Sequence, residues 1–146
     1  MTQALEPKPG QKILEIGSGS GWQSAVLSFI VGSKGKVITI EYVKELAELA
    51  KKNLKKLNIK NVLVIHGDGS KGYKKEAPFD RIILTSAAPD FPKPLINQLK
   101  EGGIILGPLG SRFEQKMVKS RKIKGGLNRE NLGSFIFVPM RGRYGY

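Results

Sequence analysis

A glycine-rich stretch near the start of the chain is the segment best suited to ligand chemistry. Gly17-Ser18-Gly19-Ser20-Gly21 directly follows the short apolar run at residues 12–16. Glycines at a turn from a strand into a helix let the backbone bend tightly, and they let a ligand approach the main chain without obstruction by a Cβ atom. Any tight turn of this kind can use glycine, so the loop by itself leaves a purely structural interpretation open.

Two acidic residues follow at positions that suit the same ligand. Glu41 ends the next β-branched run, 20 residues after Gly21, where a carboxylate can accept hydrogen bonds from ribose hydroxyls. Asp68 stands between Gly67 and Gly69 after a third apolar run, and a short acid there can reach an adenine amino group. Alternatively, Glu41 is a solvent-facing acid and Asp68 a turn former. The combination of three strand ends favours a site for an adenosine ligand.

The spacing of the loop indicates which adenosine ligand this is. The dinucleotide pattern G-x-G-x-x-G would need a glycine at position 22, where the sequence has Trp22. Glu15, two residues before the first glycine, suits a cationic ligand better than a pyrophosphate. S-adenosyl-L-methionine carries a sulfonium and an ammonium group, so the sequence predicts this molecule as the cofactor.

The elements that must position these residues alternate in hydrophobic period. The helix at 43–57 is the clearest, since Val43, Leu46, Ala47, Ala50, Leu54 and Leu57 recur at spacings of three and four. Alternating strands and helices predict right-handed βαβ units and a parallel sheet, that is, a doubly wound α/β fold. A C-terminal antiparallel hairpin is expected at 116–123 and 134–138, joined by a long polar loop. The other expected strands are 36–41, 62–65, 81–85 and 104–106, and the other helices 23–31 and 94–99, the last ended by Gly102-Gly103.

Composition excludes several classes of protein and site. The chain has 146 residues, enough for one domain with a hydrophobic core. It has no cysteine, which excludes disulfides and thiolate catalysis, and its single histidine argues against a metal site. No apolar run approaches the roughly 20 residues that span a bilayer, and the first residues do not resemble a signal peptide. We therefore expect a cytoplasmic monomer with no metal and no membrane partner.

The chain is strongly basic, with a net charge of +13. Residues 111–146 hold nine Lys or Arg against two Glu. A basic surface attracts nucleic acid, but no aromatic residues are interleaved at the spacing of a base-stacking platform. A lysine-rich solvated surface is the favoured interpretation, and nucleic acid is not the favoured partner. His66, beside a strand end, is interpreted as structural rather than as a catalytic base.

Taken together, the motifs resemble protein-L-isoaspartate O-methyltransferase, a Rossmann-like class I methyltransferase family. The resemblance runs in order along nearly the whole chain, and its Ala-Ala-Pro and Phe-Val-Pro elements are more specific than the glycine loop. It implies that residues 1–146 form a single S-adenosylmethionine-binding methyltransferase domain. The segments that carry it are Glu15 to Gln23, Gly67-Asp68-Gly69, Ala77 to Ile82, Ser86-Ala87-Ala88-Pro89, Gln98 to Gly103 and Phe137-Val138-Pro139.

The resemblance also implies roles for individual residues. The loop residues would line the methionine side of the cofactor, Glu41 would hold the ribose, and Asp68 with Gly69 would contact the adenine. The segment after the fourth strand would face the substrate. The residues so assigned are Glu15, Gly17, Ser18, Gly19 and Gly21 for the loop, and Ser86, Ala87, Ala88 and Pro89 for the substrate.

The chemistry implied is methyl-esterification of the stray α-carboxylate of isoaspartyl residues in damaged proteins, after which the ester collapses to a succinimide. A carboxylate is already ionised at pH 7, so no strong general base is required, and positioning would supply most of the rate. In agreement, the sequence offers no pair of nucleophile and base, and we nominate no catalytic residue.

Two departures from the family pattern keep other interpretations open. Family members carry a long segment before the glycine loop with a Gly-Gln-Thr-Ile-Ser-like stretch, and here only 16 residues precede Gly17. The tail at 141–146 gives no clear match to the residues expected near the family's C-terminus. We therefore expect either a truncated or mis-started chain or a site completed by other means. A non-catalytic cofactor-binding module and a tRNA or small-molecule methyltransferase, supported only by the basic charge, are the alternatives.

Overall fold

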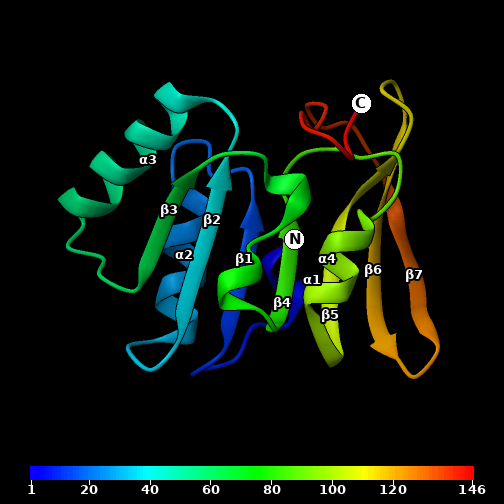
Figure 1. Cartoon of the computed structure of the whole chain (residues 1–146), viewed down its shortest axis with the longest axis horizontal. Helices are drawn as coiled ribbons and strands as arrows, with labels where there is room; N and C mark the ends of the chain where they lie inside the picture. The colour runs from blue at the N-terminus through cyan, green and yellow to red at the C-terminus, as the bar shows by residue number, and fades with distance from the viewer.

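Seven strands form one sheet in the computed structural model, which describes residues 1–146 (Figure 1). Their order is β3-β2-β1-β4-β5-β6-β7, with parallel pairing up to β5 and antiparallel pairing beyond it. Because β1 pairs with both β2 and β4, the chain reverses its direction of winding beside β1, which creates a topological switch point. The strands are β1 (Lys12–Ile16), β2 (Lys36–Glu41), β3 (Val62–His66), β4 (Phe79–Leu84), β5 (Leu99–Gly110), β6 (Gln115–Ile123) and β7 (Gly126–Phe135).

Helices cover both faces of the sheet, which confirms the predicted doubly wound class. In Figure 1, α4 lies in front of the sheet and α2 behind it. Each face has its own apolar core, one around Leu14, Ile82 and Leu95, the other around Ile13, Leu27 and Ile83. The helices are α1 (Thr2–Leu5), α2 (Trp22–Val31), α3 (Lys44–Lys56) and α4 (Lys93–Gln98), with two short 3-10 turns, η1 (Gly69–Lys71) and η2 (Lys74–Glu76). No helix is both long enough and apolar enough to cross a membrane.

The predicted apolar stripe of α3 is narrower in the structure. Ala47, Ala50 and Leu54 are buried, whereas Leu46 and Leu57 at its margins are exposed. The helix lies at the end of the sheet and packs mainly against β2 and β3, so it has fewer surfaces to cover than a central helix.

The predicted C-terminal antiparallel hairpin is confirmed as β6 and β7, but its second strand was predicted too late in the chain, at 134–138. After β6 the chain turns tightly at Lys124-Gly125, where Gly125 has φ +93°, and returns at once as β7. Residues 136–138 follow β7 instead of forming the strand. Nearly every residue of β7 is exposed because the strand lies at the edge of the sheet, so no apolar pattern marks it in the sequence.

Strand β5 is also much longer than predicted. It runs through Gly102-Gly103, which the sequence suggested as the end of a helix, while α4 ends at Gln98. A register irregularity between Phe79 and Arg81 on β4 accommodates this part of β5.

Candidate functional site

A cleft of about 640 Å³ opens at the carboxyl ends of the parallel strands. This volume lies within the range of small-ligand sites, and the place is the one where open α/β sheets bind ligands. Its walls come from the loop after β1, the end of β2, the start of η1, the segment after β4, the turn after β5 and the C-terminal tail.

The glycine loop forms the floor of this cleft in a fixed conformation. Gly17 has φ +99°, and its N–H donates to Ile40 O over 2.8 Å. The Thr85 hydroxyl donates to Ile16 O and Gly17 O over 2.9 and 2.7 Å, so a Cβ at position 17 would collide with it. Gly19 has φ +51°, and a Cβ built there would meet no protein atom within 4 Å. The space beside Gly19 is therefore free for a ligand.

Glu41 joins the loop to the end of β2. The Gly19 N–H donates to its Oε2 and the Val43 N–H to its Oε1, each over 3.0 Å. The side chain is only 7% exposed, yet it lines the cleft. Each carboxylate oxygen keeps a further lone pair, so this carboxylate is held in one place and can still accept hydrogen bonds from ligand hydroxyls.

Glu15 lies beneath the loop rather than in the cleft. It is fully buried, accepts a hydrogen bond from the Ser24 hydroxyl of α2, and leaves Oε1 without a partner. Burial raises the pKa of Glu15 to about 7 against the opposing effect of hydrogen bonds from Ser24 and Thr39, and the charge of Glu41 adds to the rise. Its side chain does not line the cleft, so contact with a ligand would have to be indirect.

Two other loop residues also face inward. The Ser18 hydroxyl hydrogen-bonds with the Thr39 hydroxyl over 2.7 Å and is buried. Gly21, which caps α2, lies against Ala50 of α3, where a Cβ would be 3.3 Å from the Ala50 Cα atom. These residues shape the loop, and only Gly17 and Gly19 among its glycines line the cleft.

Asp68 is occupied by hydrogen bonds within the chain. Its Oδ1 accepts from the Ser70 N–H and hydroxyl over 3.0 and 2.6 Å, and its Oδ2 accepts from the Arg143 N–H over 3.1 Å. Partial burial works to raise the pKa of Asp68, but these hydrogen bonds and that from Lys71 outweigh it and hold the pKa below its ordinary value. The carboxylate fastens the C-terminal tail, and of this pair only Gly69 lines the cleft.

Only part of the predicted substrate segment lines the cleft. Ser86 lines the cleft, whereas Ala87 and Ala88 are fully buried and Pro89 is exposed outside it. Ala87 exchanges hydrogen bonds with the tail, donating to Val138 O and accepting from Met140 N. Ala87 thus anchors the tail that forms one wall of the cleft, whereas Ala88 pairs with β5, donating to Pro108 O and accepting from Gly110 N.

Several cleft residues were not foreseen from the sequence. Thr85 could have been noticed as a polar residue directly after an apolar strand. Tyr42 directly follows Glu41 and could have been found in the same way. The others reach the cleft from distant parts of the chain, and no local signal marks them; they include Arg112, Met140, Arg141 and Tyr146.

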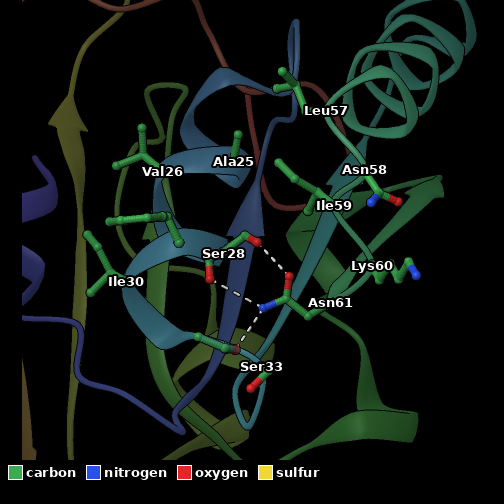
Figure 2. A pocket seen from close by; sticks show the side chains of 12 residues that line it. Ala25, Val26, Ser28, Ile30, Ser33, Leu57, Asn58, Ile59, Lys60 and Asn61 are labelled. Atoms are coloured by element: carbon green, nitrogen blue, oxygen red, sulfur yellow. Dashed lines mark hydrogen bonds between the residues drawn. The ribbon is translucent and has the colours of Figure 1, made fainter.

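A second, larger hollow lies beside α2 and has a different character. This groove, of about 1200 Å³, lies between the second half of α2 and residues 57–61 (Figure 2). Asn61 closes its floor by donating to Ser28 O and Gly32 O over 3.3 and 2.9 Å. Its lining contains no acid and one cation, Lys60. The groove therefore offers apolar contact area but few groups that do chemistry.

Comparison with known families and curated proteins identifies similar chains. The model of the family Protein-L-isoaspartate(D-aspartate) O-methyltransferase (PCMT) matches residues 1–145. Protein-L-isoaspartate O-methyltransferase 2 of Archaeoglobus fulgidus is 50% identical over 146 residues, which are 100% of this chain and 67% of the relative. The corresponding Methanococcus maripaludis protein is 47% identical over 100% of this chain and 68% of its own length.

Solved structures agree. One named protein-L-isoaspartate O-methyltransferase superposes with a TM-score of 0.93 at 32% identity, covering 98% of this chain and 46% of that one. A beta-aspartate methyltransferase (PCMT) structure from Plasmodium falciparum, in complex with S-adenosyl-L-homocysteine, gives a TM-score of 0.81 at 26% identity over 95% of this chain and 68% of that one. This chain thus spans about two thirds of its curated relatives and less than half of the first of these structures.

Proposed function

The chain belongs to the protein-L-isoaspartate(D-aspartate) O-methyltransferase family, and from this premise we propose that it uses S-adenosyl-L-methionine to methyl-esterify isoaspartyl carboxylates in damaged proteins. The observation that carries the proposal is the family match over residues 1–145. We take residues 1–146 as a single cofactor-binding domain, since one sheet with one pair of cores extends through them.

The cleft fits the cofactor. The open space at Gly19 and the bend at Gly17 leave room for the methionine portion against the main chain. Glu41 presents acceptor oxygens for the two ribose hydroxyls, and Gly69 forms the wall where the adenine would lie. Glu15 and Ser18 contribute by holding the loop from beneath, and Asp68 by fastening the tail.

When bound, S-adenosylmethionine supplies a methyl group activated by its sulfonium. The residues of the chain then bind, orient and exclude water. The lining of the cleft has no histidine, and its one carboxylate, Glu41, already accepts hydrogen bonds from Gly19 and Val43, which suits an acceptor carboxylate that is ionised at neutral pH and needs no general base. The rate would come from holding the carboxylate in line with the methyl group. Ser86, which lines the cleft after β4, is our candidate for contact with the acceptor.

We also propose that the protein acts in the cytoplasm, where this cofactor is made, as a monomer on isoaspartyl proteins. The groups that line the cleft support a carboxylate acceptor better than a nucleobase, because they include two arginines and only two aromatic residues, Tyr42 and Tyr146.

Transfer of a labelled methyl group tests the proposal. The protein is offered labelled cofactor with an isoaspartyl peptide, the same peptide with normal aspartate, and bulk tRNA. We expect base-labile label on the isoaspartyl peptide alone. Label on tRNA alone, or none on any acceptor despite cofactor binding measured by calorimetry, would reject the proposed function.

A further inference from the structure

The arginines of the chain fall into two groups, those bonded to oxygen atoms of the chain and those that form no ion pair. Arg81 donates to Leu5 O, Arg121 pairs with Glu6, and Arg129 pairs with Asp90. By contrast, two arginines that line the cleft form no ion pair with any carboxylate of the chain; these are Arg112 and Arg141. An arginine in a cleft without a carboxylate partner is free to bind an anionic ligand.

Arg112 is held in place by an aromatic ring. It follows the end of β5, and its guanidinium lies 5.5 Å from the centre of the Tyr146 ring. That ring is itself fixed at two points, because the Tyr146 hydroxyl donates to Gly110 O over 2.5 Å and its N–H donates to Met140 O over 3.1 Å. Stacking on a fixed ring orients the planar fork of the guanidinium before any ligand arrives.

The cleft is therefore polarised across the sheet. Its acid, Glu41, ends β2, whereas Arg112 follows β5, with β1 and β4 between these strands. A cofactor with cationic groups and ribose hydroxyls is complementary to the end that holds Glu41. A carboxylate acceptor is complementary to the end that holds Arg112, where Ser86 also lies.

We infer that Arg112 is a specificity-determining residue that recognises the free α-carboxylate of the acceptor through a charge-assisted hydrogen bond. The inference rests on the proposed function for the identity of the acceptor. The guanidinium binds one carboxylate oxygen, and the other oxygen remains free to attack the methyl group, so that the O–CH3 bond of the ester forms as the S–CH3 bond breaks and S-adenosylhomocysteine leaves. Substrates in which this carboxylate is replaced by a neutral carboxamide lose the contact, so Arg112 separates isoaspartyl sites from neutral amide sites such as asparagine by charge.

Binding of two matched peptides to the protein loaded with S-adenosylhomocysteine tests this inference without requiring turnover. One peptide carries an isoaspartyl residue, and the other carries its α-carboxamide analogue. For the unaltered protein we expect the acid to bind at least tenfold more tightly than the amide. In Arg112→Gln this preference falls to about twofold or less, because the acid loses affinity and the amide does not. Arg112→Lys keeps part of the preference, since it keeps the charge but not the fork.

Arg129→Gln is the matched control, because Arg129 also lies over an aromatic ring, 5.6 Å from the centre of Phe91, but outside the cleft. We expect it to keep the full preference, and all variants to bind S-adenosylhomocysteine as the unaltered protein does. The inference is overturned if Arg112→Gln retains the preference, if Arg141→Gln abolishes it instead, or if the unaltered protein shows none. A preference that depends on Arg112 without methyl transfer would uphold the inference while rejecting the proposed function.

Discussion

The groove beside α2 is larger than the cleft above the glycine loop, but the cleft has more groups that can bind a ligand. The groove has about 1200 Å³ and the cleft about 640 Å³. Yet the cleft contains a fixed carboxylate and two arginines without a carboxylate partner, whereas the groove has no acid and is bordered by apolar side chains such as Phe29, which is 88% exposed. The larger volume of the groove therefore does not make it the better ligand site.

The reason for this difference lies in the topology. Strand ends meet at the switch point beside β1, so polar residues from several separate segments converge there. The groove is bordered by one helix and one loop, which bring together only the residues of two neighbouring segments. Substitutions in the cleft and in the groove can therefore be compared for their effects on cofactor binding and on stability.

Filling the cleft should have the largest effect. In Gly19→Leu the added side chain enters space where no protein atom lies within 4 Å, so it meets only the ligand. We expect affinity for S-adenosylhomocysteine to fall about 1000-fold, or about 4 kcal/mol, while the positive φ costs about 1–2 kcal/mol of stability. Ala25→Leu, which fills the groove from α2, should leave the affinity unchanged. Calorimetry measures the affinity of both variants for S-adenosylhomocysteine. Equal losses of affinity would show that the cleft and the groove do not differ in ligand binding.

Neutralising the buried acid beneath the cleft should have the next largest effect. Since the pKa of Glu15 is raised to about 7 in the folded protein, the folded state holds its proton more tightly than the unfolded chain does. Stability from this group is complete below pH 4.5 and is lost as the pH rises to about 7, by up to about 3 kcal/mol. Glu15→Gln should therefore unfold at higher denaturant concentration than the unaltered protein at pH 8, but not at pH 4.

The groove offers the counterpart to this substitution. Asn61→Ala removes hydrogen bonds to Ser28 and Gly32 from a neutral side chain, and we expect a loss of about 1–2 kcal/mol that is the same at pH 5 and pH 8. Urea titrations at both pH values make the comparison. Two results would contradict the comparison: a loss of stability in Asn61→Ala that depends on pH, or an effect of Glu15→Gln that does not. Either result would show that the buried charge beneath the cleft does not distinguish the two regions.

Removing the charge of Glu41 should have a smaller effect on the ligand. In Glu41→Gln only one oxygen remains to accept from Gly19 and Val43, so the loop loosens and the acceptor for the ribose weakens. We expect about tenfold lower affinity for S-adenosylhomocysteine, or about 1.4 kcal/mol. Glu45→Gln, at an exposed position in the first turn of α3, is the control and should bind normally. Full affinity in the Glu41 variant would remove this residue from the ribose site.

The smallest effect is expected in the groove. Because Phe29 is almost wholly exposed, Phe29→Ser loses little packing, and we expect the free energy of unfolding to change by no more than about 0.5 kcal/mol. Affinity for the cofactor product should stay within twofold. A large loss of affinity in calorimetry would mean that the groove communicates with the cleft.

Much of the fold follows from local patterns, and the exceptions have physical causes. The apolar runs of β1, β2 and β4 and the periodic stripe of α3 are buried, so their composition reflects their surroundings, whereas β3 at the other edge of the sheet is only partly buried. Strand β7 escaped prediction because an exposed edge strand needs no apolar side chains; its backbone pairing with β6 defines it. The extent of β5 likewise depends on pairing with β4 and β6 on either side.

For the site, the sequence by itself determined the glycine loop and the acid at the end of β2, because each is marked by its neighbours in the chain. It also determined membership of the family, because the family is recognised from a series of short motifs in a fixed order. Only the tertiary structure decided which side chains reach the cleft. Strand β1 is buried on both faces, so its sequence does not reveal that Glu15 points beneath the loop. The bond from Arg143 to Asp68 spans 75 residues, and Arg112 meets Tyr146 only because the tail folds back over β5. Such contacts depend on how the elements pack. The packing places the predicted glycine loop and Glu41 at one end of a cleft that has Arg112 at its other end.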